Sequence, residues 1–482
     1  MAMEPQVHKY ERTRELNDRQ WLEKLWDLYS QKLCILNLQA ERKKERDLLE
    51  VMAWLLKSMA RDDHRMDLLM MQARHYSDIG DLNRAEETVE QLLASITPDT
   101  GRDLIRQAYE WRALIAREKT QTRRALQYYQ EAEKHADSDL DRAGIWLDKG
   151  LTMVYGNQLQ PAEKLLRQAI AVYERFNSAD ILGDAYNNLG ICLINQEKVP
   201  EALAAYSQAI RYYDRSGYKL GSAIVSGNIS EIYWYHGDYD RALRSAYDCQ
   251  RLGTEAQDQI SVGLSYEMLG RLHMDLGSFE RGAEFLKESI RAVEQVDDRA
   301  VLALNNSYLA QCYSRMGDSG KAREHFEASL AINRELDDPE LTARLDLAGI
   351  HIGRLSRPGG PVLRMIEEYT AKYRQHLRKN DVCKLLYEKA VLLSETGRQD
   401  EAEKAYAELL AGIPPTIHKS FILSVQILGH LIFKRLGNSD RASEHRHRAQ
   451  YLRDEIREHI SDPDLRSCFM GKKEVGLIDE RE

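Results

Sequence analysis

The sequence predicts an all-α solenoid of about ten stacked helix pairs, and three observations carry that prediction. Small residues return at a fixed interval, tight turns of the form Gly-x-x-x-x-Ala separate the helical segments, and the composition favours helices. Hydrophobic residues make up 43% of the 482 residues, enough for a core, while only 10 prolines interrupt them. We therefore expect residues 63–456 to form one solenoid between helical ends.

Three columns of small residues mark the places where paired helices should touch. The second column lies 12 residues before the central one and the third lies 7 residues after it, so all three keep one register. Small side chains are expected here because they let two helix axes approach closely. At steps of 40 residues, the central column reads Ala162, Ala202, Ala242, Gly282, Ala322, Val362, Ala402 and Ala442, with Ala85 and Ala125 upstream.

The turns and links between the helices carry their own signals. Glycines such as Gly237 and Gly317 stand five residues before the central column, where a left-handed backbone conformation is easily adopted. Acidic links such as Val296-Asp297-Asp298 come before the next helix, which an aspartate can cap. Each repeat is therefore expected to be a pair of antiparallel helices.

The motifs Tyr186-x-x-Leu189-Gly190, Tyr266-x-x-Leu269-Gly270 and Ala322-x-x-x-Phe326 resemble the signature of tetratricopeptide repeats. The resemblance covers residues 63–456 and is strongest over 180–335. It implies a right-handed α-α superhelix whose first helices line a concave groove for a protein or peptide. The long repeat is similar to those of kinesin light chains, spindle-orientation adaptors and bacterial signalling regulators.

Three segments depart from the repeat. Residues 1–62 read as helix, and we expect them to form either a cap or a docking element. Near residues 345–380 the pattern is degenerate, and the Pro/Gly-rich segment 357–361 predicts either a kink or a longer loop. The tail 457–482 resembles the one that closes the repeat array of large bacterial regulators.

The sequence contains no complete enzyme motif, so we expect a protein without catalytic residues, cofactor or metal. Gly317 to Ala322 resembles a phosphate loop, but Ala322 stands where Ser or Thr would bind the metal. His445 and His447 have no matching ligand pattern. The cysteines lie far apart, and Cys192, Cys249 and Cys312 occupy core positions of the repeat.

The charge balance limits the possible partners. A net charge of −9 argues against nucleic acid as a ligand, because such proteins carry an excess of Lys and Arg. No stretch is apolar and long enough to span a bilayer, so we expect no membrane partner and a cytoplasmic location.

The resemblance also indicates where a partner would bind. In the long-repeat relatives an asparagine two residues before the first small column binds the main chain of a peptide, and only Asn188 and Asn228 match it. Replacing both by Ala should weaken a peptide roughly tenfold to a hundredfold without a change in melting temperature. The expected groove residues are Asn187, Asn188, Ile191, Asn195, Asn228, Glu231, Trp234, Tyr235, Arg271, Gln311 and Arg315.

Two alternatives remain open at this site. Trp234 and Tyr235 either contact the ligand, as aromatic residues beside an arginine often do, or only pack between repeats. Arg271 and Arg315 either bind an acidic ligand or pair with Glu231 and Asp275.

The leading functional hypothesis is a non-catalytic module that holds a protein or peptide in its groove. The alternatives are the sensor arm of a STAND-type ATPase or of a protease or nuclease signalling system, with a catalytic partner protein, and a peptide-responsive regulator similar to the Rap family.

Overall fold

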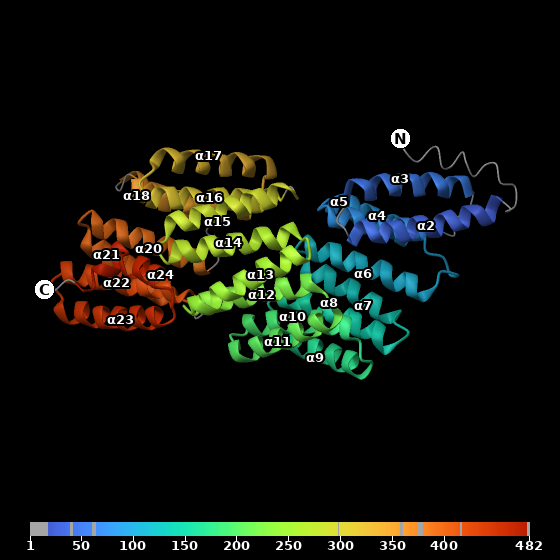
Figure 1. Cartoon of the computed structure of the whole chain (residues 1–482), viewed down its shortest axis with the longest axis horizontal. Coiled ribbons are helices and arrows are strands. Elements are labelled where there is room, and N and C mark those ends of the chain that lie inside the picture. Colours follow the sequence, from blue (N-terminus) through green and yellow to red (C-terminus); the bar gives the residue numbers. More distant parts are fainter. Residues whose placement is uncertain are drawn as a thin grey trace. The chain divides into compact units, whose positions relative to one another are not determined.

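The computed structural model describes residues 18–38, 42–59, 64–296, 298–356, 360–373, 379–414 and 417–479, and in these residues the regular elements are all helices (Figure 1). The predicted all-α class is thereby confirmed. The chain divides into two compact units, residues 1–196 and residues 197–482, which are described separately. From Arg65 to Glu458 the helices follow one another as the ten pairs that the repeat predicts.

Unit 1 begins with two helices that precede the repeats. The apolar faces of these helices pack together through Trp26, Leu48, Met52 and Leu55, all buried. The described part of residues 1–62 is helical, and its role as cap or docking element stays a prediction. Residues 1–17 and the side chains of Trp21 and Leu22 lie outside the described residues. The helices of unit 1 are α2 (Asp18–Leu38), α3 (Arg42–Met59), α4 (Arg65–Asp78), α5 (Leu82–Ala94), α6 (Arg102–Glu118), α7 (Thr122–Lys134), α8 (Asp139–Tyr155), α9 (Leu159–Arg175) and α10 (Ala179–Asn195).

Unit 2 contains the remaining repeats and the C-terminal tail. Even-numbered helices from α12 to α22 are the first helices of their repeats, and each packs against the helix that follows it. The helices are α11 (Val199–Ser216), α12 (Lys219–Tyr235), α13 (Tyr239–Glu255), α14 (Gln259–Asp275), α15 (Phe279–Glu294), α16 (Arg299–Arg315), α17 (Ser319–Leu336), α18 (Pro339–Ser356), α19 (Gly360–Tyr373), α20 (Lys379–Glu395), α21 (Gln399–Gly412), α22 (Lys419–Arg435), α23 (Ser439–Glu458), α24 (Pro463–Met470) and α25 (Lys473–Gly476).

The small-residue columns lie where paired helices come closest. A Cβ built on Gly282 would stand 3.1 Å from the backbone oxygen of Gly270, and one on Gly270 would overlap Leu286 at 2.7 Å. Where the column holds a polar residue, that side chain bonds across the pair, as Ser230 Oγ does to the carbonyl oxygen of Ala242 at 2.8 Å. The interval in the sequence thus reflects close helix packing.

The turns within the pairs have the expected geometry. Gly237 and Gly317 adopt φ angles of 73° and 81°, the left-handed region in which glycine carries no Cβ penalty. The next residue caps the second helix, as Asp238 and Asp318 accept the backbone N–H three residues onward at 3.1 Å.

The degenerate repeat keeps the helix pair but fills it differently. Val362 and Tyr369 stand in the small columns and are buried, together with Ile350 of the preceding helix. Larger side chains therefore occupy the space that Ala or Gly fills elsewhere. Only residues 357–359 separate α18 from α19, and they lie outside the described residues, as does the choice between kink and loop.

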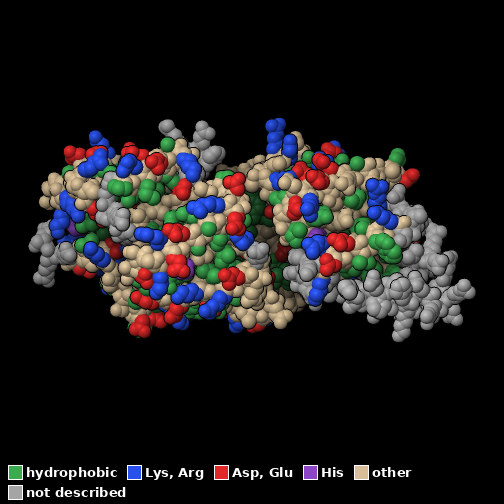
Figure 2. Space-filling model, turned by 90° about the horizontal axis from the view of Figure 1, so that it is seen from above, with side chains coloured by type: hydrophobic (Ala, Val, Ile, Leu, Met, Phe, Trp, Pro, Cys, Tyr) green, Lys and Arg blue, Asp and Glu red, His purple; other side chains and the backbone are tan. Residues whose placement is uncertain are grey.

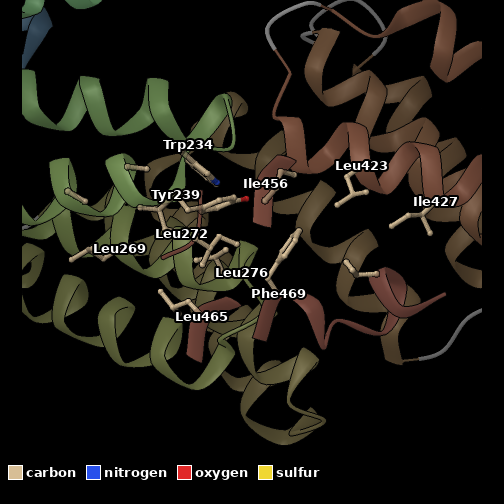
Figure 3. Close-up of a cluster of buried hydrophobic side chains, with 14 of the residues drawn as sticks. Trp234, Tyr239, Leu269, Leu272, Leu276, Leu423, Ile427, Ile456, Leu465 and Phe469 are labelled. Carbon is tan, nitrogen blue, oxygen red and sulfur yellow. The ribbon is translucent and has the colours of Figure 1, made fainter. Parts of the chain in front are cut away.

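The C-terminal region of unit 2 packs against repeats far earlier in the sequence. One apolar cluster joins Trp234, Tyr239 and Leu272 to Ile456 and Phe469 (Figure 3). Polar contacts extend the same interface, since Asp240 accepts hydrogen bonds from the backbone N–H and the hydroxyl of Ser461, both at 2.8 Å. Unit 2 therefore closes on itself, with the last repeat and the tail covering α12 to α14.

Among the described helices, none has the length and apolar content needed to cross a lipid bilayer.

Candidate ligand-binding chamber

The first helices of unit 2 enclose a chamber of about 630 Å³. Its walls come from α12, α14, α16, α18, α20 and α22, and the start of the tail helix α25 adds Glu474. A cavity of this volume falls in the range of sites that enclose a drug-sized ligand. The C-terminal region of unit 2 contributes Lys472 and Glu474 to this partly open inner surface.

Seven of the eleven predicted groove residues belong to unit 2, and six of these line the chamber. They are Glu231, Trp234, Tyr235, Arg271, Gln311 and Arg315. Asn228 lies on α12, half-buried, but outside the chamber lining. The other four, Asn187, Asn188, Ile191 and Asn195, lie on α10 of unit 1. Their role in binding stays a prediction.

Asp275 is the centre of the most densely bonded cluster in the chamber wall. Its Oδ2 accepts hydrogen bonds from Trp234 Nε1 at 2.9 Å, Tyr239 OH at 2.5 Å and Ser420 Oγ at 2.8 Å. Burial alone would raise the pKa of Asp275, but Lys472 and the donors Tyr239 and Trp234 hold that pKa below its usual value. A buried carboxylate with this many donors stays charged and joins three separate helices to the tail.

Trp234 and Tyr235 pack against a histidine from the last repeat. The His418 ring stacks on Tyr235 with 3.8 Å between ring centroids and lies 4.2 Å from Trp234. Burial lowers the pKa of His418, so the ring is neutral near pH 7. Trp234 is 8% exposed, so it is mainly part of the core that holds the last repeat, while Tyr235 is half-buried at the chamber edge.

Two arginines from different repeats meet around Tyr308. The guanidinium of Arg271 lies 5.3 Å from the Tyr308 ring centroid and 4.6 Å from that of Trp234. Arg344 Nη2 donates to the Tyr308 hydroxyl at 3.3 Å. Burial alone would lower the pKa of Arg271, but Tyr308 and the nearby Glu267 and Glu231 carboxyls raise it above the usual value. The Arg271 guanidinium therefore remains charged.

The arginine pairs differ from those expected. Arg271 Nη1 pairs with Glu267 Oε1 at 3.2 Å on its own helix, and Arg315 Nη1 lies 3.8 Å from Glu474 Oε1 of the tail. The alternative that these arginines form salt bridges with Glu231 and Asp275 is therefore wrong. The repeat pattern favours partners one repeat apart, as Asp275 and Arg315 are, whereas Glu474 reaches Arg315 only because the tail folds back.

The opposite wall of the chamber holds a buried ion cluster. Glu388 accepts from His351 Nδ1 at 2.8 Å and pairs with Arg354. Burial would raise the pKa of Glu388, but the charges and hydrogen bonds of His351 and Arg354 lower that pKa to about 2. This carboxylate is ionised at neutral pH and its oxygens are already used.

The tail forms a lasting wall of the chamber. Leu465, Phe469, Val475 and Ile478 are buried, and burying each such side chain contributes about 1.5–3 kcal/mol. Together they contribute about 6–12 kcal/mol, which few ligands could replace. At Gly277 an added Cβ would stand 2.9 Å from Lys472 Cγ, so the tail lies directly on this turn. We therefore treat Lys472 and Glu474 as permanent parts of the lining.

Some lining residues were not among the predicted set. Tyr308 stands in the same column as Asn188 and Asn228, and Arg344 stands 40 residues after Leu304, so the repeat register could have found both. His418, Lys472 and Glu474 carry no such signal, because their approach depends on how the C-terminal region docks.

The described residues show no grouping of His, Cys, Asp and Glu suited to a metal ion. Cys192, Cys249 and Cys312 are buried in the helix pairs, as the register predicted. Burial raises the pKa of the Cys249 thiol to about 11 and that of Cys312 to about 12, so both stay protonated. A space-filling view shows charged side chains of both signs interspersed over the described surface (Figure 2).

Comparisons with known proteins follow the repeat region. The family model described as "Tetratricopeptide repeat" matches residues 182–252 and 261–335. The 43 kDa receptor-associated protein of the synapse from Tetronarce californica is 26% identical over 159 residues, which are 32% of this chain and 38% of that protein. The chain thus matches well under half the length of this curated relative.

Two solved structures superpose on most of this chain at low sequence identity. A signal transduction ATPase with a tetratricopeptide repeat sensor, from Pyrococcus horikoshii, superposes with a TM-score of 0.52 at 14% identity, covering 76% of this chain and 54% of that one. A Rap protein complexed with Competence and Sporulation Factor gives a TM-score of 0.45 at 13% identity, over 91% of this chain and 99% of that one.

Proposed function

Because the chain is a tetratricopeptide-repeat protein, we propose that it binds a peptide, or an extended segment of a partner protein, in the chamber of unit 2. The fold supports a protein-interaction module, and the chamber gives that module a location. Binding and release, without covalent chemistry, would be its activity.

One observation carries this proposal. Six residues that the family resemblance assigned to a groove line one chamber, although they come from three helices. Tyr235 and Arg271 supply the aromatic and guanidinium groups that dominate binding energy at interfaces. The amide of Gln311 can donate and accept together, as a peptide unit requires. Among the described residues it forms a single long hydrogen bond, of 3.4 Å, from Nε2 to Ser307 O within its own helix.

Filling the chamber tests the proposal. Gln311→Trp places a large side chain into the cavity without removing a bond between helices. The matched control is Glu324→Trp, on the exposed side of α17. The probe is a pool of random hexapeptides, applied to immobilised full-length protein, and the retained fraction is measured by mass spectrometry.

We expect the wild-type chain and Glu324→Trp to retain the same peptides. Gln311→Trp should retain at least tenfold less, since loss of about 1.4 kcal/mol is tenfold in affinity. All three proteins should melt at similar temperatures. Equal retention by Gln311→Trp would place binding outside the chamber and contradict the proposal.

A further inference from the structure

We infer that the chamber selects ligands by a carboxylate group, which binds between Arg344 and Arg271 beside the hydroxyl of Tyr308. The inference rests on the proposed function, because it names the chemical class of the peptide held at that site. The ligand is a short peptide that carries an acidic side chain or a free C-terminal carboxylate.

The first argument is the charge of the lining. Among its described residues six cations face five carboxylates: Arg271, Arg315, Arg344, Arg354, Lys384 and Lys472 against Glu231, Asp275, Asp381, Glu388 and Glu474. Several of these charges form salt bridges within the wall. Glu388 pairs with Arg354, and Glu474 pairs with Arg315. Glu231 lies near Arg271, and one further guanidinium of the wall forms no salt bridge among the described residues.

Arg344 is that further guanidinium. No carboxylate of the described residues forms a salt bridge with it, and its recorded bond is to the neutral hydroxyl of Tyr308 at 3.3 Å. The residue is half-buried on α18, so water screens its charge less than at an open surface. An arginine in this setting presents several unused N–H donors in the planar arrangement that fits a carboxylate.

Tyr308 brings the second guanidinium to the same place. Its ring lies 5.3 Å from the Arg271 guanidinium, while its hydroxyl contacts Arg344. Among the described residues, Arg271 forms a salt bridge with Glu267 of its own helix alone, at 3.2 Å. A carboxylate that enters between the arginines would meet positive charge from two repeats, α14 and α18, and the Tyr308 hydroxyl between them.

The size of the chamber limits the ligand. A volume of about 630 Å³ suits a drug-sized molecule, and the tail residues Lys472 and Glu474 form part of the lining. The buried residues of the tail make this limit permanent. A short peptide with a carboxylate satisfies both the volume and the charge.

The test compares three pools of hexapeptides on the full-length protein. The first carries free carboxylates, the second replaces Asp and Glu by Asn and Gln and ends in an amide, and the third adds one phosphoserine to the second. The variants are Arg344→Gln and Arg344→Lys. The charge-matched control is Arg323→Gln, an exposed arginine of α17.

We expect the wild-type chain and Arg323→Gln to prefer the first pool over the second by about tenfold to a hundredfold, as charge-assisted hydrogen bonds do. Arg344→Gln should lose this preference, and Arg344→Lys should keep part of it. Unchanged circular dichroism and melting temperature show that the variants fold.

Other outcomes overturn the inference. Equal retention of the first two pools by the wild-type chain, or a preference that survives in Arg344→Gln, contradicts carboxylate selection but leaves peptide binding intact. Stronger retention of the third pool than of the first assigns the site to phosphate instead. Retention of no pool contradicts the proposed function together with this inference.

Discussion

Two of the polar clusters that line the chamber of unit 2 differ in how completely their charges are paired. Around Asp275, donors from Trp234, Tyr239 and Ser420 satisfy the carboxylate. Around Tyr308, Arg344 has no carboxylate partner among the described residues. The first cluster is closed within the fold, and the second still presents charge to the cavity.

The difference separates residues that build the chamber from residues that can bind in it. A buried charge whose partners are all present contributes when the chain folds, and removing it leaves those partners unsatisfied. A cation that lacks a counter-charge gains one only from a ligand. Changes in the Asp275 cluster should therefore appear in stability, and changes around Tyr308 in affinity.

Asp275→Ala is expected to produce the largest loss of stability. The variant leaves Tyr239 OH and Trp234 Nε1 without their acceptor in a buried site, which should lower the free energy of unfolding by about 3–5 kcal/mol. Urea denaturation measures this. The control is Glu284→Ala, an exposed residue that pairs only with Arg281, for which we expect less than about 0.5 kcal/mol.

A small loss in Asp275→Ala, similar to that of Glu284→Ala, would show that the bonded cluster is not what holds the tail and last repeat to α12 and α14. That result would contradict the claim that the Asp275 cluster contributes to stability.

His273 gives a second test of what an unsatisfied buried group costs. Its Nδ1 has no hydrogen-bond partner among the described residues, and burial, with the charge of Arg281, lowers the pKa of His273 to about 4. The unfolded chain binds a proton near pH 6.5, so stability is present above that pH and is lost as pH falls towards 4.

His273→Phe should remove this part of the pH dependence. Between pH 7 and pH 4.5 the wild-type chain should lose about 2–3 kcal/mol more than the variant, as followed by urea denaturation at each pH. Parallel stability profiles for the two proteins would mean that His273 is not held neutral by its surroundings.

Asn188→Ala and Asn228→Ala, made singly, should have the smallest effects. Neither residue lines the chamber, so a peptide held there should change less than about twofold in affinity, whereas the groove predicted from the sequence requires about 1 kcal/mol, or roughly fivefold, from each amide; the melting temperature should stay nearly unchanged. Retention of hexapeptides and thermal melting measure the two quantities. A fall in melting temperature without a fall in retention would assign these asparagines to the structure.

The repeat interval predicted much of the fold and part of the site. It placed the helix pairs, the tight turns and the small columns, because each depends on contacts within one repeat or between neighbours. It also placed Trp234 and Arg271 at the chamber wall. Trp234 both lines the chamber and belongs to the core. The sequence did not predict this double role, which depends on the contacts of Trp234 with Asp275 and His418.

The closure of unit 2 was beyond such reasoning. Ser461 bonds to Asp240 across 221 residues, and Ser420 reaches Asp275 across 145. No periodicity links these positions, since they meet through the summed path of the intervening repeats. The partner of Arg315 was mistaken for the same reason.

A crystal structure of the full-length protein with a retained hexapeptide tests the central claim most directly. The account predicts peptide density inside the chamber of unit 2, with a carboxylate within hydrogen-bond distance of Arg344. Density on the outer helices α13, α15 or α17, with the chamber empty, would contradict it.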